Sequence, residues 1–64
     1  MTINQLLQKC SRKGITPYAV CQRSGISQVT VSRWKKRNHE PLPETLDLFE
    51  QAARAIAEER GLTW

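Results

Sequence analysis

Apolar residues recur at helical spacing along most of the chain, and no alternating run bounded by turns indicates a strand. The first stripe lies within residues 3–13, where four apolar residues are spaced i, i+3, i+4 and i+7: Ile3, Leu6, Leu7 and Cys10. Thr2 can cap this helix, and Gly14 is a natural stop after it. The pattern therefore predicts a first helix over about residues 3–13.

Two shorter helical patterns follow, joined at Gly25. The first begins at Thr16, an N-cap residue with proline directly after it, and runs to Ser24. Within this helix Val20 and Cys21 should point inward, where a small side chain lets two helices cross closely. Gly25 then permits a positive φ in the turn.

The second of these patterns covers about residues 28–37, with Ser27 as its cap. Val31 and Trp34 share a face at helical spacing, so we expect Trp34 in the core and not stacked on a base. Two short helices joined at a glycine, over about residues 17–37, predict a helix-turn-helix that can enter the DNA major groove.

A longer helix is expected over about residues 43–60, before Gly61. One apolar seam steps by four and three residues through Leu42, Leu46, Phe49, Ala53 and Ile56. A second, smaller stripe consists of Leu48, Ala52 and Ala55. Both stripes can belong to one core, but a domain this small rarely surrounds a helix. We therefore expect the second stripe, with Leu62 and Trp64, to form a dimer interface.

These patterns predict an all-α fold, a compact four- to five-helix bundle that makes residues 1–64 a single domain. A core of this size is marginal but feasible, and it leaves no room for a ligand-sensing domain. No apolar run approaches membrane-spanning length, and no signal-peptide pattern opens the chain. We expect a soluble, cytoplasmic protein that neither contacts a membrane nor binds a small molecule.

Charge is divided unevenly along the chain. Residues 1–39 hold eight Lys and Arg and no Asp or Glu, whereas residues 40–64 hold all six acidic residues and two Arg. The two parts carry +8 and −4, which sum to the net charge of +4. A polyanion is the partner that the first part suits best.

Catalytic and metal-binding patterns are missing from the sequence. His39 is the only histidine and has no evident Cys or Ser partner, and no glycine-rich phosphate loop occurs. Cys10 and Cys21 do not form a CxxC pair, and with His39 they lack the spacing of metal ligands. We expect two reduced thiols, no enzyme activity, no metal and no cofactor.

The segment from Thr16 to Arg37 resembles the helix-turn-helix of the Cro/C1-type (XRE-like) phage and bacterial repressors. The likeness rests on the turn glycine and the buried positions of that family: Val20, Cys21, Gly25, Ile26, Val31 and Trp34. Residues 41–46 also look like the family's link into its fourth helix, so the resemblance covers about residues 3–58. Two positions depart from the pattern, because Cys21 stands where Ala is usual and Ser24 where Leu is commoner.

This resemblance implies a lambda-repressor-like DNA-binding domain whose third helix enters the major groove N-terminus first. The family's base-reading positions map onto Gln28, Val29, Ser32 and Arg33. This agrees with helical spacing, which places Val29, Ser32, Arg33 and Lys36 opposite Val31 and Trp34, with Gln28 at the flank. Phosphate contacts are expected from a larger set of polar and basic residues: Thr16, Tyr18, Gln22, Arg23, Thr30, Lys35, Lys36, Arg37 and Asn38. We expect Lys9, Lys13 and Arg54 to be simple solvated charges.

The function expected from this resemblance is a Cro-like repressor that occupies a pseudo-palindromic operator in double-stranded DNA as a homodimer. It would act on the nucleoid of a bacterium or a phage-infected host. Two alternatives remain open at this point. One is an antitoxin-type protein that binds a toxin through its rear helix, and the other is a phage activator or excision factor.

Overall fold

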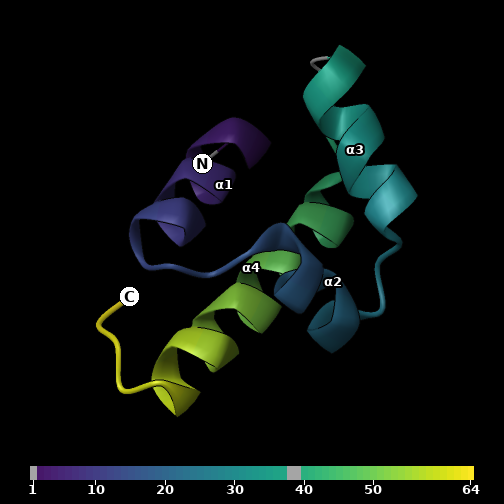
Figure 1. Cartoon of the computed structure of the whole chain (residues 1–64). Coiled ribbons are helices and arrows are strands. Elements are labelled where there is room, and N and C mark those ends of the chain that lie inside the picture. Colours follow the sequence, from purple (N-terminus) through teal and green to yellow (C-terminus); the bar gives the residue numbers. More distant parts are fainter. Residues whose placement is uncertain (1, 38–39) are drawn as a thin grey trace.

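The computed structural model describes residues 2–37 and 40–64, and every regular element in them is an α-helix. The four helices in these ranges are α1 (Ile3–Arg12), α2 (Pro17–Ser24), α3 (Gln28–Arg37) and α4 (Pro43–Glu59) (Figure 1). The all-α expectation is confirmed. The first and fourth helices each end one residue earlier than expected, because Lys13 and Arg60 are their C-cap residues.

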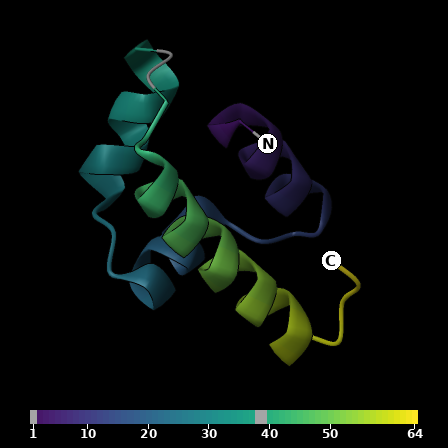
Figure 2. The ribbon, with the colours of Figure 1, turned by 180° about the vertical axis from the view of Figure 1, so that it is seen from behind.

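The longest helix, α4, organises the other three. Figures 1 and 2 show α4 running diagonally through the molecule, with α2 against its middle and α1 and α3 on either side. Thirteen residues from all four helices and the segment after α1 form one core: Ile3, Leu6, Cys10, Ile15, Val20, Cys21, Val31, Trp34, Phe49, Ala52, Ala53, Ile56 and Ala57. Trp34 lies edge-on to Phe49, with ring centroids 6.0 Å apart, so its expected core position is confirmed.

The start of α1 is fixed by two sets of hydrogen bonds. Thr2 and Gln5 form a reciprocal capping box, in which Thr2 Oγ1 accepts from the Gln5 N–H at 3.2 Å and Gln5 Oε1 accepts from the Thr2 N–H at 2.9 Å. The carboxylate of Glu40 accepts from the Ile3 N–H at 3.1 and 3.2 Å. Glu40 thereby ties the segment before α4 to the positive end of α1, a contact that helix patterns along the chain do not reveal.

Two expectations about α4 were wrong. Leu42 is 71% exposed and does not join the packing seam, because it is the N-cap residue and its backbone has left the helical register. Ala52 is buried in the core of its own chain, so it is not available to a partner. Only Leu48, at 55% exposed, and the half-buried Ala55 remain on the outer face of the second stripe.

The C-terminal residues fold back onto α1. After Gly61, with φ of 70°, the Leu62 N–H donates to the Ala57 carbonyl at 2.8 Å, which turns the chain away from the helix axis. Trp64 packs against the core and lies under Lys9, whose Nζ is 4.6 Å from the ring centroid. Trp64 thus has contacts within its own chain while it stays partly buried, and its place in a dimer interface remains a prediction.

Lys9 and Lys13 also differ from the expected solvated charges. Lys13 Nζ donates to the Thr63 carbonyl oxygen, and Lys9 covers the Trp64 ring. Nearby, Arg60 Nη1 donates to the Gly14 carbonyl at 3.1 Å. These contacts hold the tail against the end of α1, so neither lysine faces solvent alone.

Candidate nucleic-acid interface

The corner between α2 and α3 is set by one cap and one turn. Thr16 Oγ1 accepts from the Ala19 N–H at 3.2 Å and caps α2. At the other end Gly25 adopts φ of 80°, and its N–H donates to the Cys21 carbonyl at 2.9 Å. A side chain on Cβ disfavours this left-handed conformation, so glycine is the residue that makes the corner at low cost.

Burial of one side of α3 determines which side faces outward. Val31 is 3% exposed and Trp34 is 5% exposed, and both belong to the core. At the helix start Ser27 Oγ accepts from the Val29 N–H at 3.1 Å. The side of α3 opposite Val31 and Trp34 is therefore directed into solvent.

All four residues expected to read bases are exposed on that outer side of α3: Gln28, Val29, Ser32 and Arg33. Lys36 is exposed among them. Val29 is 60% exposed, which leaves its methyl groups able to pack on a ligand. The structure thus brings one amide, one hydroxyl, one guanidinium and one apolar side chain together on a single helix face.

A shallow groove of 180 Å³ separates the start of α2 from α3. Its polar lining consists of Tyr18, Gln28, Ser32 and Lys35. Gln22 Nε2 donates to the Tyr18 hydroxyl at 2.6 Å, a contact between residues four apart on α2 that fixes the ring. The groove therefore offers hydroxyl, amide and ammonium groups beside the helix end where backbone N–H groups attract anions.

The other residues expected to contact phosphate are placed less uniformly. Thr30 is half-buried, and the side chain of Arg37 and all of Asn38 lie outside the described residues. Arg23 forms an ion pair with Glu59 on α4, and both side chains are about half exposed, at 47% and 54%. Arg23 must leave Glu59 to reach DNA, although an exposed ion pair of this kind contributes only about 0–1 kcal/mol.

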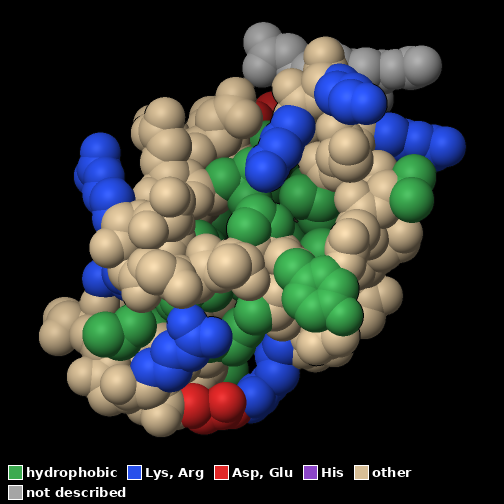
Figure 3. Space-filling view, in the orientation of Figure 1, with side chains coloured by type: hydrophobic (Ala, Val, Ile, Leu, Met, Phe, Trp, Pro, Cys, Tyr) green, Lys and Arg blue, Asp and Glu red, His purple; other side chains and the backbone are tan. Residues whose placement is uncertain are grey.

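The surface around α3 is predominantly basic. On the face drawn in Figure 3, Lys and Arg side chains are spread over several helices, whereas few acidic side chains are visible. The exposed cations of α3 itself include Arg33, Lys35 and Lys36. Such a surface suits a phosphate backbone and is electrostatically unfavourable for a cationic ligand.

The two thiols lie inside the fold, and Cys21 also borders the groove between α2 and α3. Cys10 and Cys21 are both unpaired and buried. Burial raises the pKa of the Cys10 thiol, an effect that a backbone hydrogen bond and Lys9 partly oppose. Burial likewise raises the pKa of Cys21, against a smaller lowering by Lys35. Both thiols are therefore weak nucleophiles at neutral pH.

The described ranges offer neither a metal site nor a membrane-spanning helix. No group of three His, Cys, Asp or Glu in residues 2–37 and 40–64 could hold a metal ion. His39 lies outside those ranges. No helix in the described part of the chain combines the length and apolar character needed to cross a membrane.

Comparison with known proteins gave one match. The model of the homeodomain-like domain family matches residues 5–43, which is more than half of the 64-residue chain. The matched range contains nearly all of α1, then α2 and α3, and it ends where α4 begins. No curated protein and no solved structure matches the chain.

Proposed function

The chain belongs to the homeodomain-like domain family, a helix-turn-helix DNA-binding family, and from this premise we propose that it is a sequence-specific regulator of transcription. The observation that carries the proposal is the outer side of α3. Its base-reading candidates project into solvent together, while Val31 and Trp34 fix the helix from behind. A helix held in this way can enter the major groove without rearranging the fold.

Each candidate on α3 has a chemical counterpart on a base edge. The Gln28 amide can pair bidentately with adenine, and the Arg33 guanidinium can pair with O6 and N7 of guanine. Ser32 can donate or accept, and Val29 can pack on a thymine methyl group. Each good bidentate contact contributes about 1–3 kcal/mol of discrimination between bases.

Phosphate contacts supply affinity in this proposal. Tyr18 and Lys35 border the groove at the start of α2, where a phosphate oxygen can also meet free backbone N–H groups. Thr16, Gln22 and Lys36 are further exposed candidates, whereas Thr30 is half-buried. These contacts bring salt dependence but little sequence preference.

We further propose the Cro/C1-type mode of action for this domain. In support, α4 follows the residues that the homeodomain-like match covers and packs on α2, and the resemblance to Cro/C1-type repressors likewise implies a fourth helix there. A homodimer would present two copies of α3 about 34 Å apart, one turn of DNA, and so double the base contacts of a single domain. Repression then follows from occupying a pseudo-palindromic operator, without catalysis.

Selection of binding sites from a pool of random duplexes tests the proposal. We expect enrichment of two half-sites related by two-fold symmetry, with centres about 10 base pairs apart. Enrichment of a single half-site would support sequence-specific DNA binding but would contradict the homodimer. Failure to enrich any sequence, with equal affinity for every duplex, would overturn the sequence-specific function.

A regulator that also binds a protein, as an antitoxin does, is the second candidate. Leu42 and Leu48 favour it, because they are 71% and 55% exposed on the α4 side of the molecule. Mass measurement in solution separates the two candidates. A purified dimer that is lost on Leu48→Ser substitution favours a homodimeric repressor, whereas a stable monomer favours the partner-binding regulator.

A further inference from the structure

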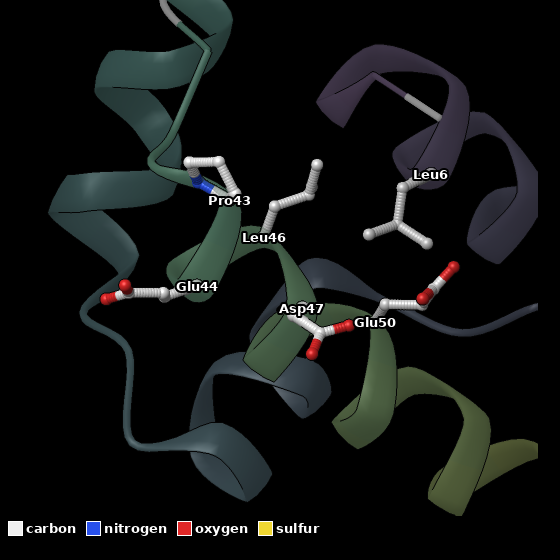
Figure 4. A pocket seen from close by; sticks show the side chains of 6 residues that line it. All are labelled: Leu6, Pro43, Glu44, Leu46, Asp47 and Glu50. Atoms are coloured by element: carbon white, nitrogen blue, oxygen red, sulfur yellow. The ribbon is translucent and has the colours of Figure 1, made fainter.

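A groove of 480 Å³ lies between α1 and the first turns of α4, and nothing in the proposed DNA contact uses it (Figure 4). Its lining consists of Leu6, Pro43, Glu44, Leu46, Asp47 and Glu50. None of these residues belongs to α2 or α3. DNA bound at α3 would therefore leave the groove open. Its volume falls within the range of about 300–1,000 Å³ that is usual for ligand-binding sites.

The groove has an apolar floor and an acidic border. Leu6 is fully buried on α1, and the half-buried Leu46 faces it across the opening. Glu50 extends from α4 toward α1, while Glu44 extends to the other side of the helix (Figure 4). Asp47 lies between them in sequence and is exposed. A bound segment would meet the partly exposed Leu46 beside the buried Leu6, with the Glu50 carboxylate on the side toward α1.

The charge of the groove lining comes from Glu44, Asp47 and Glu50. Within residues 2–37 and 40–64 none of the three carboxylates takes part in an ion pair. Asp47 accepts a hydrogen bond at 3.3 Å from Gln51, which carries no charge. Carboxylates spaced three residues apart on one helix repel each other, so a cation from outside would relieve this repulsion. The same carboxylates repel a nucleic acid.

We propose that this groove binds a positively charged segment of another protein, with an aliphatic side chain on the partly exposed Leu46 beside the buried Leu6 and flanking Lys or Arg side chains on Asp47 and Glu50. Charge complementarity selects this occupant over DNA or an acidic peptide. A second copy of this chain fits less well, because the exposed cations of α3 are those assigned to DNA. The choice of another protein over a second copy rests on the proposed DNA contact, whereas the shape and charge of the groove do not.

Titration with a synthetic peptide tests this assignment. The probe is an acetylated and amidated peptide that carries one leucine with two arginines on each side, and the readout is the NMR shift of leucine methyl groups together with calorimetry. We expect saturable binding with the largest shifts at Leu6 and Leu46. Glu50→Gln should weaken binding at least about threefold, whereas Glu58→Gln, on the same helix but outside the groove, should leave it unchanged.

Several outcomes would overturn the inference. These are the absence of saturable binding, equal weakening by both substitutions, or shifts centred on α3. Shifts at Leu6 and Leu46 that appear with rising protein concentration alone would assign the groove to a second copy. Titrating a random DNA duplex in parallel keeps the two proposals separate, because Glu50→Gln should not weaken DNA binding.

Discussion

At the scale of single residues, the structure separates side chains that hold the fold from those available to a ligand. Trp34 and Arg33 are neighbours in sequence, yet the first is 5% exposed beside Phe49 and the second is exposed on the outer side of α3. Burial therefore assigns Trp34 to packing and leaves Arg33 for recognition. Substitutions at these two positions should act on different properties, stability for Trp34 and sequence preference for Arg33.

Replacing Arg33 with alanine should relax the base preference at one base pair in each half-site. The loss of a bidentate contact to guanine should cost about 1–3 kcal/mol on the selected operator. Competition binding against operators changed at single positions measures this effect. Arg54→Ala, which removes the same charge from α4, serves as the control. Equal losses on the operator and on random DNA would refute the reading role of Arg33.

The buried thiols predict a loss of stability at alkaline pH. Burial holds the pKa of Cys10 and of Cys21 above the ordinary value, so the unfolded chain releases these protons first as the pH rises. Their contribution to the free energy of unfolding is fully present below the unfolded pKa of about 8.5. It is lost as the pH rises through the pKa of the folded state. Urea denaturation at neutral pH and at about pH 9.5 should show this decrease.

The control for that measurement is the double variant Cys10→Ala, Cys21→Ala. It should be less stable at every pH because cavities remain, but its free energy of unfolding should decline less steeply above about pH 8.5. All other ionisable groups are present in both proteins, so the difference between the two pH slopes reports the thiols. Identical pH slopes would show that the thiols contribute nothing to the alkaline decrease.

At the scale of elements, the sequence was sufficient where a local signal exists. Caps and glycines mark the helix ends, so Thr2, Thr16 and Gly25 located α1, α2 and the turn. Apolar periodicity likewise identified the buried side of α3, and with it the face that carries the candidate site. The helix-turn-helix corner was therefore predictable as a unit.

The parts that the sequence did not predict depend on contacts between distant elements. Glu40 meets the Ile3 N–H and Arg60 meets the Gly14 carbonyl, and neither pair is close in sequence. The contact between Trp64 and Lys9 also joins residues that are far apart in sequence. The prediction for Leu42 was wrong for another reason, because the apolar periodicity was extended one residue beyond the helix, into its N-cap. The groove between α1 and α4 was likewise not predictable, because it exists only where these two helices meet.

Gly25→Ala should destabilise the corner without any steric clash. A Cβ at this position meets nothing within 4 Å, so the cost comes from the left-handed backbone alone and should be about 1–2 kcal/mol. Gly25→Asn should cost less, because asparagine tolerates this conformation. Chemical denaturation of the three proteins provides the measurement. Equal stability of the alanine variant and the parent would mean that the turn adopts another conformation.

At the scale of the whole molecule, one small core supports two surfaces of opposite charge. The basic surface includes Arg33, Lys35 and Lys36 on α3, and the acidic groove includes Glu44, Asp47 and Glu50 beside α4. Since the two are built from different helices, one can be changed by mutation with little effect on the other. This separation allows affinity for DNA and affinity for a protein to be tested one at a time.

Lys35→Ala should weaken binding to all duplexes alike. The slope of the logarithm of affinity against the logarithm of salt concentration should fall in magnitude by about 1, as expected for one lost phosphate contact. Lys9→Ala removes the same charge, but Lys9 lies over Trp64, and we expect that variant to keep the parent slope. Fluorescence anisotropy at several salt concentrations distinguishes the two. An identical change in both variants would show that net charge alone matters.

The return of the C-terminal tail onto α1 has a spectroscopic consequence. The chain contains two indoles in different surroundings, Trp34 edge-on to Phe49 in the core and the partly buried Trp64 beneath an ammonium group. Emission from the first changes only when the core opens, whereas emission from the second also changes when the tail detaches. Single-tryptophan variants can therefore follow local release and global unfolding separately, without an added dye.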